Sequence, residues 1–323
     1  MAAQRQEACG MDQPPTTSPP LQTPPQGQPT SAAEPGWLWE SVRYQFWRAA
    51  DLDRSIRHLG PFTTEQGEAI AYWWSLLAAV EGLGPRAYAA AFVGATERRD
   101  SEQVRWSLLA MLRDELQHEQ LCRMMLRHLT PDWPLHDPPP NDLARHLHDA
   151  YEQAEQCWSG CRRALDQHGV GVVEGGLLLL ELVTGALYEG WATTCTLPTF
   201  TTAFRHAARD AQRHQAVLRA LAARDWPLLS ARERAEAAAQ VQTAASFLST
   251  VVRGPDHRQP EPPVDLLARH AGLGVPTAAQ RQELLRTALL KVKDLQLRYG
   301  IPFPAMPELA IAGTEKDPAR RGE

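Results

Sequence analysis

The chain has 323 residues, of which 43% are hydrophobic, and its 38 acidic and 33 basic side chains give a formal net charge of −5 at pH 7. This composition can supply one sizeable core, and the lack of a basic surplus argues against nucleic acid as a partner. Five cysteines in so long a chain do not predict a disulfide framework.

The N-terminal residues 1–35 are rich in proline and polar side chains, with too little apolar surface to offset the entropy lost on ordering. We predict a disordered tail, with a proline-rich ligand for a partner domain as the less favoured alternative. The tail also lacks the apolar core of a signal peptide. The most apolar run, residues 170–191, contains Glu174, Glu181 and Glu189, which argues against a membrane span. We therefore expect a soluble, cytoplasmic protein without a membrane partner.

From Trp37 onward the sequence pattern is almost wholly helical. Capping-box sequences mark helix starts at Thr63, Asp100, Ser230 and Thr277, each followed three residues later by Gln or Glu. The predicted helices cover residues 64–93, 101–129, 142–167, 170–196, 200–225, 231–252 and 278–299.

The helical pattern divides the chain into a bundle domain at residues 36–253, a proline-rich linker at 254–264 and a helical extension at 265–323. The extension carries Leu285, Leu289 and Val292 on one stripe of its helix. We therefore expect the extension to pack on the bundle, which gives an all-α fold.

Four of the predicted helices place ionisable side chains on their apolar faces, namely Glu81, Glu115 with His118, Glu181, and His214. Burying a charge costs several kcal/mol per ion unless it is paired, neutralised or bound to a cation. Glu115 and His118 lie one helical turn apart on the same face, close enough to hold one metal ion. Carboxylate oxygen with imidazole nitrogen suits iron, manganese or zinc.

Each of these features has a simpler interpretation when it is taken alone. With 11 histidines in the chain, about one Glu-x-x-His sequence is expected by chance. Glu81 or Glu181 could equally be a hydrogen-bonded acid of the core. Order and spacing favour a shared metal site, because the sequence Arg-Asp-x-x-x-His occurs at both 113–118 and 209–214. Two helix hairpins related by a pseudo-repeat would produce this pattern.

On these residues the chain resembles the ferritin-like di-iron carboxylate superfamily, whose members carry two Glu-x-x-His sequences and two further acids. The resemblance covers about residues 64–225. Its spacing is most similar to the oxygenase branch typified by arylamine N-oxygenases, and more distantly to the ribonucleotide reductase small subunit. It implies a ferritin-like four-helix bundle with additional C-terminal helices, and the metal ligands Glu81, Glu115, His118, Glu181 and His214.

The resemblance also implies residues that surround these ligands. Asp114 and Asp210 match positions whose carboxylates hydrogen-bond a metal-bound His of the opposite hairpin and so fix its tautomer. Cys122 and Tyr188 are further residues expected around the ligands. Cys122 stands where reductase small subunits usually have a radical-forming Tyr, which argues against that activity. Ala211 stands where the second Glu-x-x-His should have its Glu, so one ligand position is degenerate.

Two functions remain open at this point. The first is an O2-dependent oxidoreductase or oxygenase with two iron ions, or one tight and one labile, and manganese as the alternative metal. It would use an electron donor and act on an unknown small apolar or aromatic substrate, which the apolar positions Trp74, Tyr88, Met111 and Tyr188 would suit. A homodimer is one option for its assembly. The second is a degenerate, non-catalytic bundle that serves as a scaffold or binds a partner. Iron storage is less favoured, because the chain has long extensions.

Overall fold

Helices make up the regular structure of the part of the chain that the computed structural model describes. The described residues are 47–129, 142–255, 261–309, 311 and 313. Among them the only pairing of β type is an isolated bridge between Met306 and Ile311. The predicted all-α class is therefore confirmed, while the predicted tail at 1–35 lies outside the described residues.

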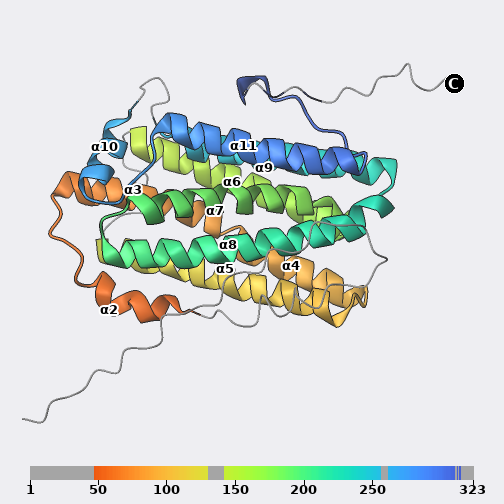
Figure 1. Ribbon diagram of the computed structural model, residues 1–323, viewed down its shortest axis with the longest axis horizontal. Helices are drawn as coiled ribbons and strands as arrows, with labels where there is room; N and C mark the ends of the chain where they lie inside the picture. The colour runs from red at the N-terminus through yellow and green to blue at the C-terminus, as the bar shows by residue number, and fades with distance from the viewer. Residues whose placement is uncertain (1–46, 130–141, 256–260, 310, 312, 314–323) are drawn as a thin grey trace, which may run out of the picture. The chain divides into compact units, whose positions relative to one another are not determined.

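The helices follow one another in a simple order along the chain (Figure 1). They are η1 Ala49–Leu52, α2 Asp53–Ile56, α3 Thr64–Glu81, α4 Gly84–Glu97, α5 Glu102–Leu129, α6 Asp142–His168, η2 Val170–Val172, α7 Glu174–Thr194, α8 Pro198–Asp225, η3 Trp226–Leu228, α9 Ala231–Arg253, α10 Pro263–His270, α11 Ala278–Arg298 and η4 Pro307–Leu309.

Four of these helices form the bundle that carries the inward-facing charges. Helix α5 packs against α3 and α8, and α8 packs along the length of α7. Helices α6, α9 and α11 form a further layer, in which α6 covers α3 and α4 while α9 and α11 cover α7 (Figure 1). The predicted four-helix bundle with additional C-terminal helices is thus present.

The predicted helix at 64–93 is in fact two helices, with a break between Glu81 and Gly84. A Cβ atom at Gly84 would overlap the carboxylate of Glu115 on the neighbouring α5. The Glu115 side chain therefore fits here only because residue 84 is glycine. Pro85 follows in the first turn of α4, where a helix needs no backbone N–H donor, so the N–H that proline lacks costs nothing. Gly82, Gly84 and Pro85 are a local signal for this break, which the prediction of one continuous apolar stripe overlooked.

The start of α5 also differs from the prediction. The Ser101 hydroxyl, rather than Asp100, accepts a hydrogen bond from the Val104 backbone N–H at 3.4 Å. Asp100 instead accepts a hydrogen bond from Arg98 at 2.8 Å and lies 3.7 Å from Arg224. The predicted capping box at Asp100 is therefore wrong, because two arginines compete for its carboxylate. The other three capping boxes are confirmed, at Thr63, Ser230 and Thr277.

The C-terminal region contains one helix more than the sequence pattern predicted. Helix α10 begins at Pro263, inside the predicted linker. Helix α11 packs on α7 and α9 and buries Leu285, Leu289 and Val292, as their spacing indicated.

A buried ion pair joins these two C-terminal helices. Arg281 donates a hydrogen bond to Asp265 at 2.8 Å, neither side chain is exposed, and the guanidinium lies 4.6 Å from the centre of the Trp73 ring. We expect Arg281→Met to lower the free energy of unfolding by about 3–5 kcal/mol, because Asp265 is left buried without its partner. Urea denaturation measures this loss. The double variant Arg281→Met/Asp265→Leu should recover most of it, and a single variant as stable as the natural chain would contradict the expectation.

One helical stretch among the described residues, Thr64–Glu97, is long and apolar enough to cross a membrane by length and composition. It spans α3 and α4, and 56% of its most apolar window is buried inside the bundle. Location in the cytoplasm stays a prediction.

Candidate metal centre

A layer of ionisable side chains lies between two hydrophobic clusters of the core. One cluster includes Tyr88, which contacts Glu181, and the other includes Tyr188, which contacts Glu81. Desolvating so many charged groups is costly unless each of them is compensated. This layer is therefore the candidate functional site. Its members are at most 6% exposed, and they are Glu81, Asp114, Glu115, His118, Glu181, Asp210 and His214.

The five predicted ligands converge in two overlapping triads. Glu81 at the end of α3 joins Glu115 and His118 on α5. Glu115 also joins Glu181 on α7 and His214 on α8. In each triad, one possible ligand atom of every residue lies within 4.8 Å of the other two. The two helix hairpins thus bring together residues that are far apart in the sequence, as the pseudo-repeat predicted.

The shared residue, Glu115, lies between the two imidazoles. Its Oε1 atom is 3.5 Å from Nδ1 of His118 and 3.1 Å from Nδ1 of His214. The other carboxylates lie on the outer sides, with Glu81 Oε2 3.2 Å from Nδ1 of His118 and Glu181 Oε1 3.1 Å from Nδ1 of His214. Both histidines therefore direct the same nitrogen, Nδ1, toward the same carboxylate.

The opposite nitrogen of each imidazole faces an aspartate of the other hairpin. His118 Nε2 lies 3.1 Å from Oδ2 of Asp210, and His214 Nε2 lies 3.5 Å from Oδ2 of Asp114. The second contact is longer than an ordinary hydrogen bond, so the His214 side is held less tightly. A proton held on Nε2 leaves the Nδ1 lone pair directed at the triads, as in metal-ligating histidines. Of the two crossed hydrogen bonds that the resemblance implied, the structure has the one between His118 and Asp210, while His214 only lies near Asp114.

Two residues that the sequence analysis missed hold these aspartates. Arg213 reaches Oδ2 of Asp114 at 3.2 Å and also binds Asp210, so one guanidinium links the two repeats. The half-buried Trp47 donates its indole N–H to Oδ2 of Asp210 at 2.7 Å and stacks on His206. Arg213 follows Asp210 by three residues, a spacing that could have indicated the pair. No sequence signal connects Trp47 to a site so far along the chain.

Two tyrosines bind the outer carboxylates in a crossed arrangement. Tyr88 on α4 donates its hydroxyl to Oε1 of Glu181 at 2.6 Å, and Tyr188 on α7 donates to Oε1 of Glu81 at 2.5 Å. Each Tyr follows the Glu of its own repeat by seven residues, so the pseudo-repeat extends beyond the ligands. Tyr188 was predicted around the ligands, whereas Tyr88 was predicted only as apolar lining.

Cys122 is buried in the same core cluster as Tyr188, one helical turn beyond His118. Burial, together with the nearby Glu81 carboxylate, raises the pKa of its thiol well above the ordinary value. The thiol is therefore neutral at pH 7.

The second repeat differs from the first at Ala211. This residue is buried, and a Cβ atom at Gly185 on α7 would lie 3.0 Å from the Ala211 Cβ. The same Cβ would also lie 3.0 Å from the amide nitrogen of Gln215, which donates to the Glu181 carbonyl at 2.9 Å. Helices α7 and α8 therefore approach closely at the position where the first repeat has the Glu115 carboxylate.

The charges in the layer depend strongly on one another. Burial, and then the Glu115 charge, raises the pKa of Glu81; burial also raises the pKa of Glu181. Burial opposes ionisation of Glu115 as well, but hydrogen bonds from His118 and His214 lower its pKa to about 2. Burial opposes the charge of both imidazoles, yet the surrounding carboxylates raise their pKa values well above the ordinary range. Without metal, protonated imidazoles compensate the carboxylates.

This donor set fits two divalent cations. Three carboxylates and two neutral imidazoles carry a charge of −3, so two divalent ions that replaced the imidazole protons would leave the donors and ions together with a charge of +1. Mixed oxygen and nitrogen donors suit iron, manganese or zinc better than calcium or magnesium, which prefer oxygen alone. The triads can therefore hold a pair of transition-metal ions, with one carboxylate fewer than the superfamily pattern.

No known protein family matches the sequence, and neither does any curated protein. Similar solved structures include three mutant forms of an R2-like ligand-binding oxidase with an aerobically reconstituted Mn/Fe cofactor. All three are 16% identical to this chain and cover 81% of it. The matched share of the three structures is 92%, 95% and 92% of their own chains, with TM-scores of 0.46, 0.46 and 0.43 in the same order. A likeness of this degree does not establish function, which has to follow from the side chains of the candidate centre. The similarity to arylamine N-oxygenases stays a prediction.

Proposed function

We propose that the protein binds two transition-metal ions, with iron as the metal and manganese as the alternative. Glu81, Glu115 and His118 would hold the first ion, and Glu115, Glu181 and His214 the second. The observation that carries this proposal is the position of Glu115 Oε1 between the two Nδ1 atoms. A carboxylate oxygen placed between two imidazoles, with a further carboxylate beside each of them, supplies the donor atoms for two neighbouring ions.

The two positions would differ in strength. Glu81 and His118 belong to the first position alone, and the close contact of His118 with Asp210 holds that imidazole in place. The second position has Ala211 where a further carboxylate would complete it, and its His214 lies farther from Asp114. We therefore propose one tightly held ion and one labile ion, with a coordination position left for O2, water or substrate.

The reaction we propose is an O2-dependent oxidation of a small apolar or aromatic substrate. Bound iron would supply the capacity to activate O2 with electrons from a separate reductant. The chain itself holds the carboxylates with Tyr88 and Tyr188, fixes the imidazoles with Asp114 and Asp210, and excludes bulk water from the layer. We also propose that a separate electron donor serves the centre and that the chain forms a homodimer. The domain boundaries predicted from the sequence belong to the same proposal.

Metal analysis after anaerobic loading with Fe²⁺ tests the proposed function, with O2 consumption followed after exposure to air. We expect about one tightly held iron per chain after desalting, a second iron that is lost in that step, and O2 uptake that depends on the iron. A chain that binds neither iron, manganese nor zinc above background would contradict the proposal. The degenerate scaffold, which Ala211 favours, would then be the better explanation.

The crossed tyrosines allow the two positions to be separated. We expect Tyr188→Phe to weaken metal binding at the Glu81 position by about 10–100-fold, because partners of metal ligands typically contribute this much. Tyr88→Phe should do the same at the Glu181 position. Competition with a chelator measures both affinities. Tyr151→Phe is the matched control, since Tyr151 donates to the Ser75 carbonyl at 3.2 Å and touches no predicted ligand. Equal affinities in all three variants would contradict the role of the tyrosines.

A further inference from the structure

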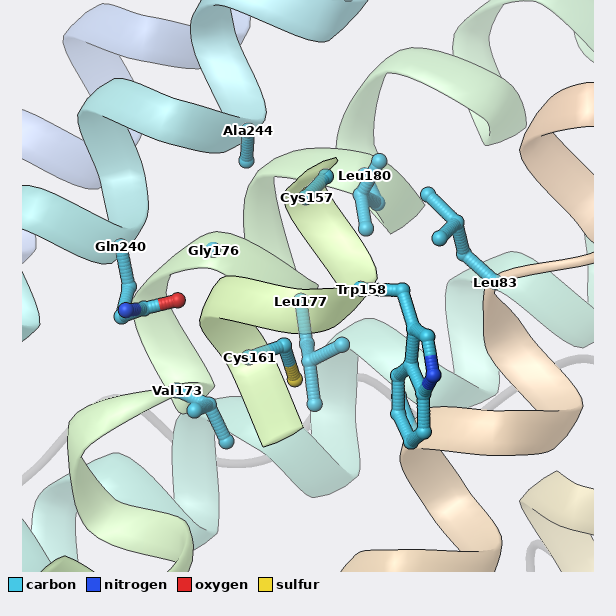
Figure 2. A pocket seen from close by; sticks show the side chains of 11 residues that line it. Leu83, Cys157, Trp158, Cys161, Val173, Gly176, Leu177, Leu180, Gln240 and Ala244 are labelled. Carbon is cyan, nitrogen blue, oxygen red and sulfur yellow. The ribbon is translucent and has the colours of Figure 1, made fainter. Parts of the chain in front are cut away.

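A small apolar cavity lies beside the candidate metal centre, where α4, α6, α7 and α9 meet (Figure 2). Its volume is about 20 Å³. The lining comes from leucine, alanine, cysteine and tryptophan side chains, and Figure 2 shows Leu83, Cys161, Leu177 and Leu180 around it.

A second cavity of about 20 Å³ lies against the metal centre itself. Its walls include Glu81, Glu115 and Glu181 of the two triads. Leu177 and Leu180 line both cavities, so these two side chains of α7 are the shared wall. Leu177 precedes Glu181 by one helical turn, and Leu180 is adjacent to it in the sequence. The two cavities are therefore neighbours, separated by Leu177 and Leu180.

Among the residues that the structure describes, no charged side chain lines the first cavity. Its one polar side chain, Gln240, donates its amide to Glu236 at 2.7 Å. Burial raises the pKa of Cys157 to about 11, and burial followed by the charge of Cys157 raises that of Cys161 to about 12. Both thiols are therefore neutral at pH 7. Ions and water gain little in such a cavity, whereas an apolar molecule loses nothing on entering it.

Volume limits the occupant to a very small molecule. A cavity of this size accommodates about one water-sized molecule, and apolar cavities of proteins stay dry while they accept apolar gases such as xenon. Organic ligands need pockets of about 300–1,000 Å³. The cavity is thus suited to a diatomic gas and too small for the organic substrate.

We propose that this cavity is a binding site for O2 and that O2 passes between Leu177 and Leu180 to the metal centre. The inference rests on the proposed function, because only a metal centre that reacts with O2 needs such a passage. It assigns a role to the α6 side chains Cys157, Trp158 and Cys161, which contribute no ligand to either triad.

Xenon binding tests the cavity in the metal-free protein, independently of any activity. Crystals under xenon pressure should show xenon beside Leu177 in the natural chain and no xenon there in Leu177→Phe, whose ring fills the shared wall. Leu180→Phe is the second variant, because Leu180 is half-buried and has more room to turn outward. Absence of xenon from the natural chain would overturn the proposal.

The rate of O2 reaction tests the passage. In stopped-flow mixing of Fe²⁺-loaded protein with O2, we expect Leu177→Phe and Leu180→Phe to lower the second-order rate constant by about tenfold, with iron stoichiometry unchanged. Leu165→Phe is the matched control, since Leu165 is a half-buried leucine of α6 that lines neither cavity. If Leu177→Phe and Leu180→Phe both reacted with O2 as fast as the control, the proposed passage would be refuted. If the natural chain bound no iron, the proposed function would be contradicted instead. Metal analysis distinguishes this result from a failure of the passage alone.

Discussion

Ala211→Glu should raise the metal content from one tightly held ion toward two per chain. The substitution restores the carboxylate that the second repeat lacks, on the helix face that already carries His214 three residues later. A complete Glu-x-x-His sequence would give the second ion its own carboxylate, instead of a share of Glu115. Metal analysis after anaerobic Fe²⁺ loading and desalting measures the change.

The same variant should also be less stable than the natural chain when metal is absent. It adds a fourth carboxylate to the three of the triads, close to Glu115 and Glu181, and like charges at close range disfavour one another. Its longer side chain also has little room toward α7, because even a Cβ added at Gly185 would lie 3.0 Å from the Ala211 Cβ. Metal should restore the stability, since a ligand that binds only the folded state raises its unfolding free energy. Thermal unfolding with and without Mn²⁺ shows both effects.

Ala211→Gln is the matched control for this experiment. The glutamine has the same length but no charge, so it should neither raise metal content nor make stability depend more strongly on metal. If Glu and Gln at position 211 gave the same metal content as the natural chain, the asymmetric site would be refuted.

His118→Ala should abolish tight binding at the first position. The variant removes the imidazole nitrogen, which would bind the first ion together with Glu81 and Glu115. It also leaves Asp210 without its imidazole partner. Loss of an outer partner alone typically costs about 10–100-fold in metal affinity, so loss of the ligand itself should cost more than about 100-fold. Chelator competition measures the affinity. His214→Ala should affect the weaker position instead.

A surface histidine provides the control for the His118 variant. His148 is exposed and pairs only with Glu152 of its own helix, at 3.2 Å. His148→Ala should leave metal affinity unchanged. If His118→Ala retained the affinity of this control, the first triad would not be a metal site.

The sequence indicated most helices, because their signals are local. Apolar periodicity and the capping boxes at Thr63, Ser230 and Thr277 depend on residues within one turn. The break between α3 and α4 was missed although Gly82, Gly84 and Pro85 signal it locally, because the apolar stripe was read as continuous. Asp100 was assigned as a cap in error, because its contact with Arg224 depends on tertiary packing.

The inward direction of the charges was determined by the sequence alone. Glu81, Glu115, His118, Glu181 and His214 lie on apolar stripes, and a helix that buries such a stripe must bury them too. Helical spacing therefore predicted the members of the cluster, and the repeat of Arg-Asp-x-x-x-His predicted that two hairpins contribute to it.

Only the tertiary structure decided how these residues are connected. Helix packing places Glu115 rather than Glu181 between the imidazoles, crosses Tyr88 and Tyr188 between the repeats, and brings Trp47 to Asp210. Such contacts depend on the distance and rotation between helices, which periodicity within one helix does not specify. The cavity beside Leu177 and Leu180 has the same origin, because it is the space that four separately predicted helices leave between them.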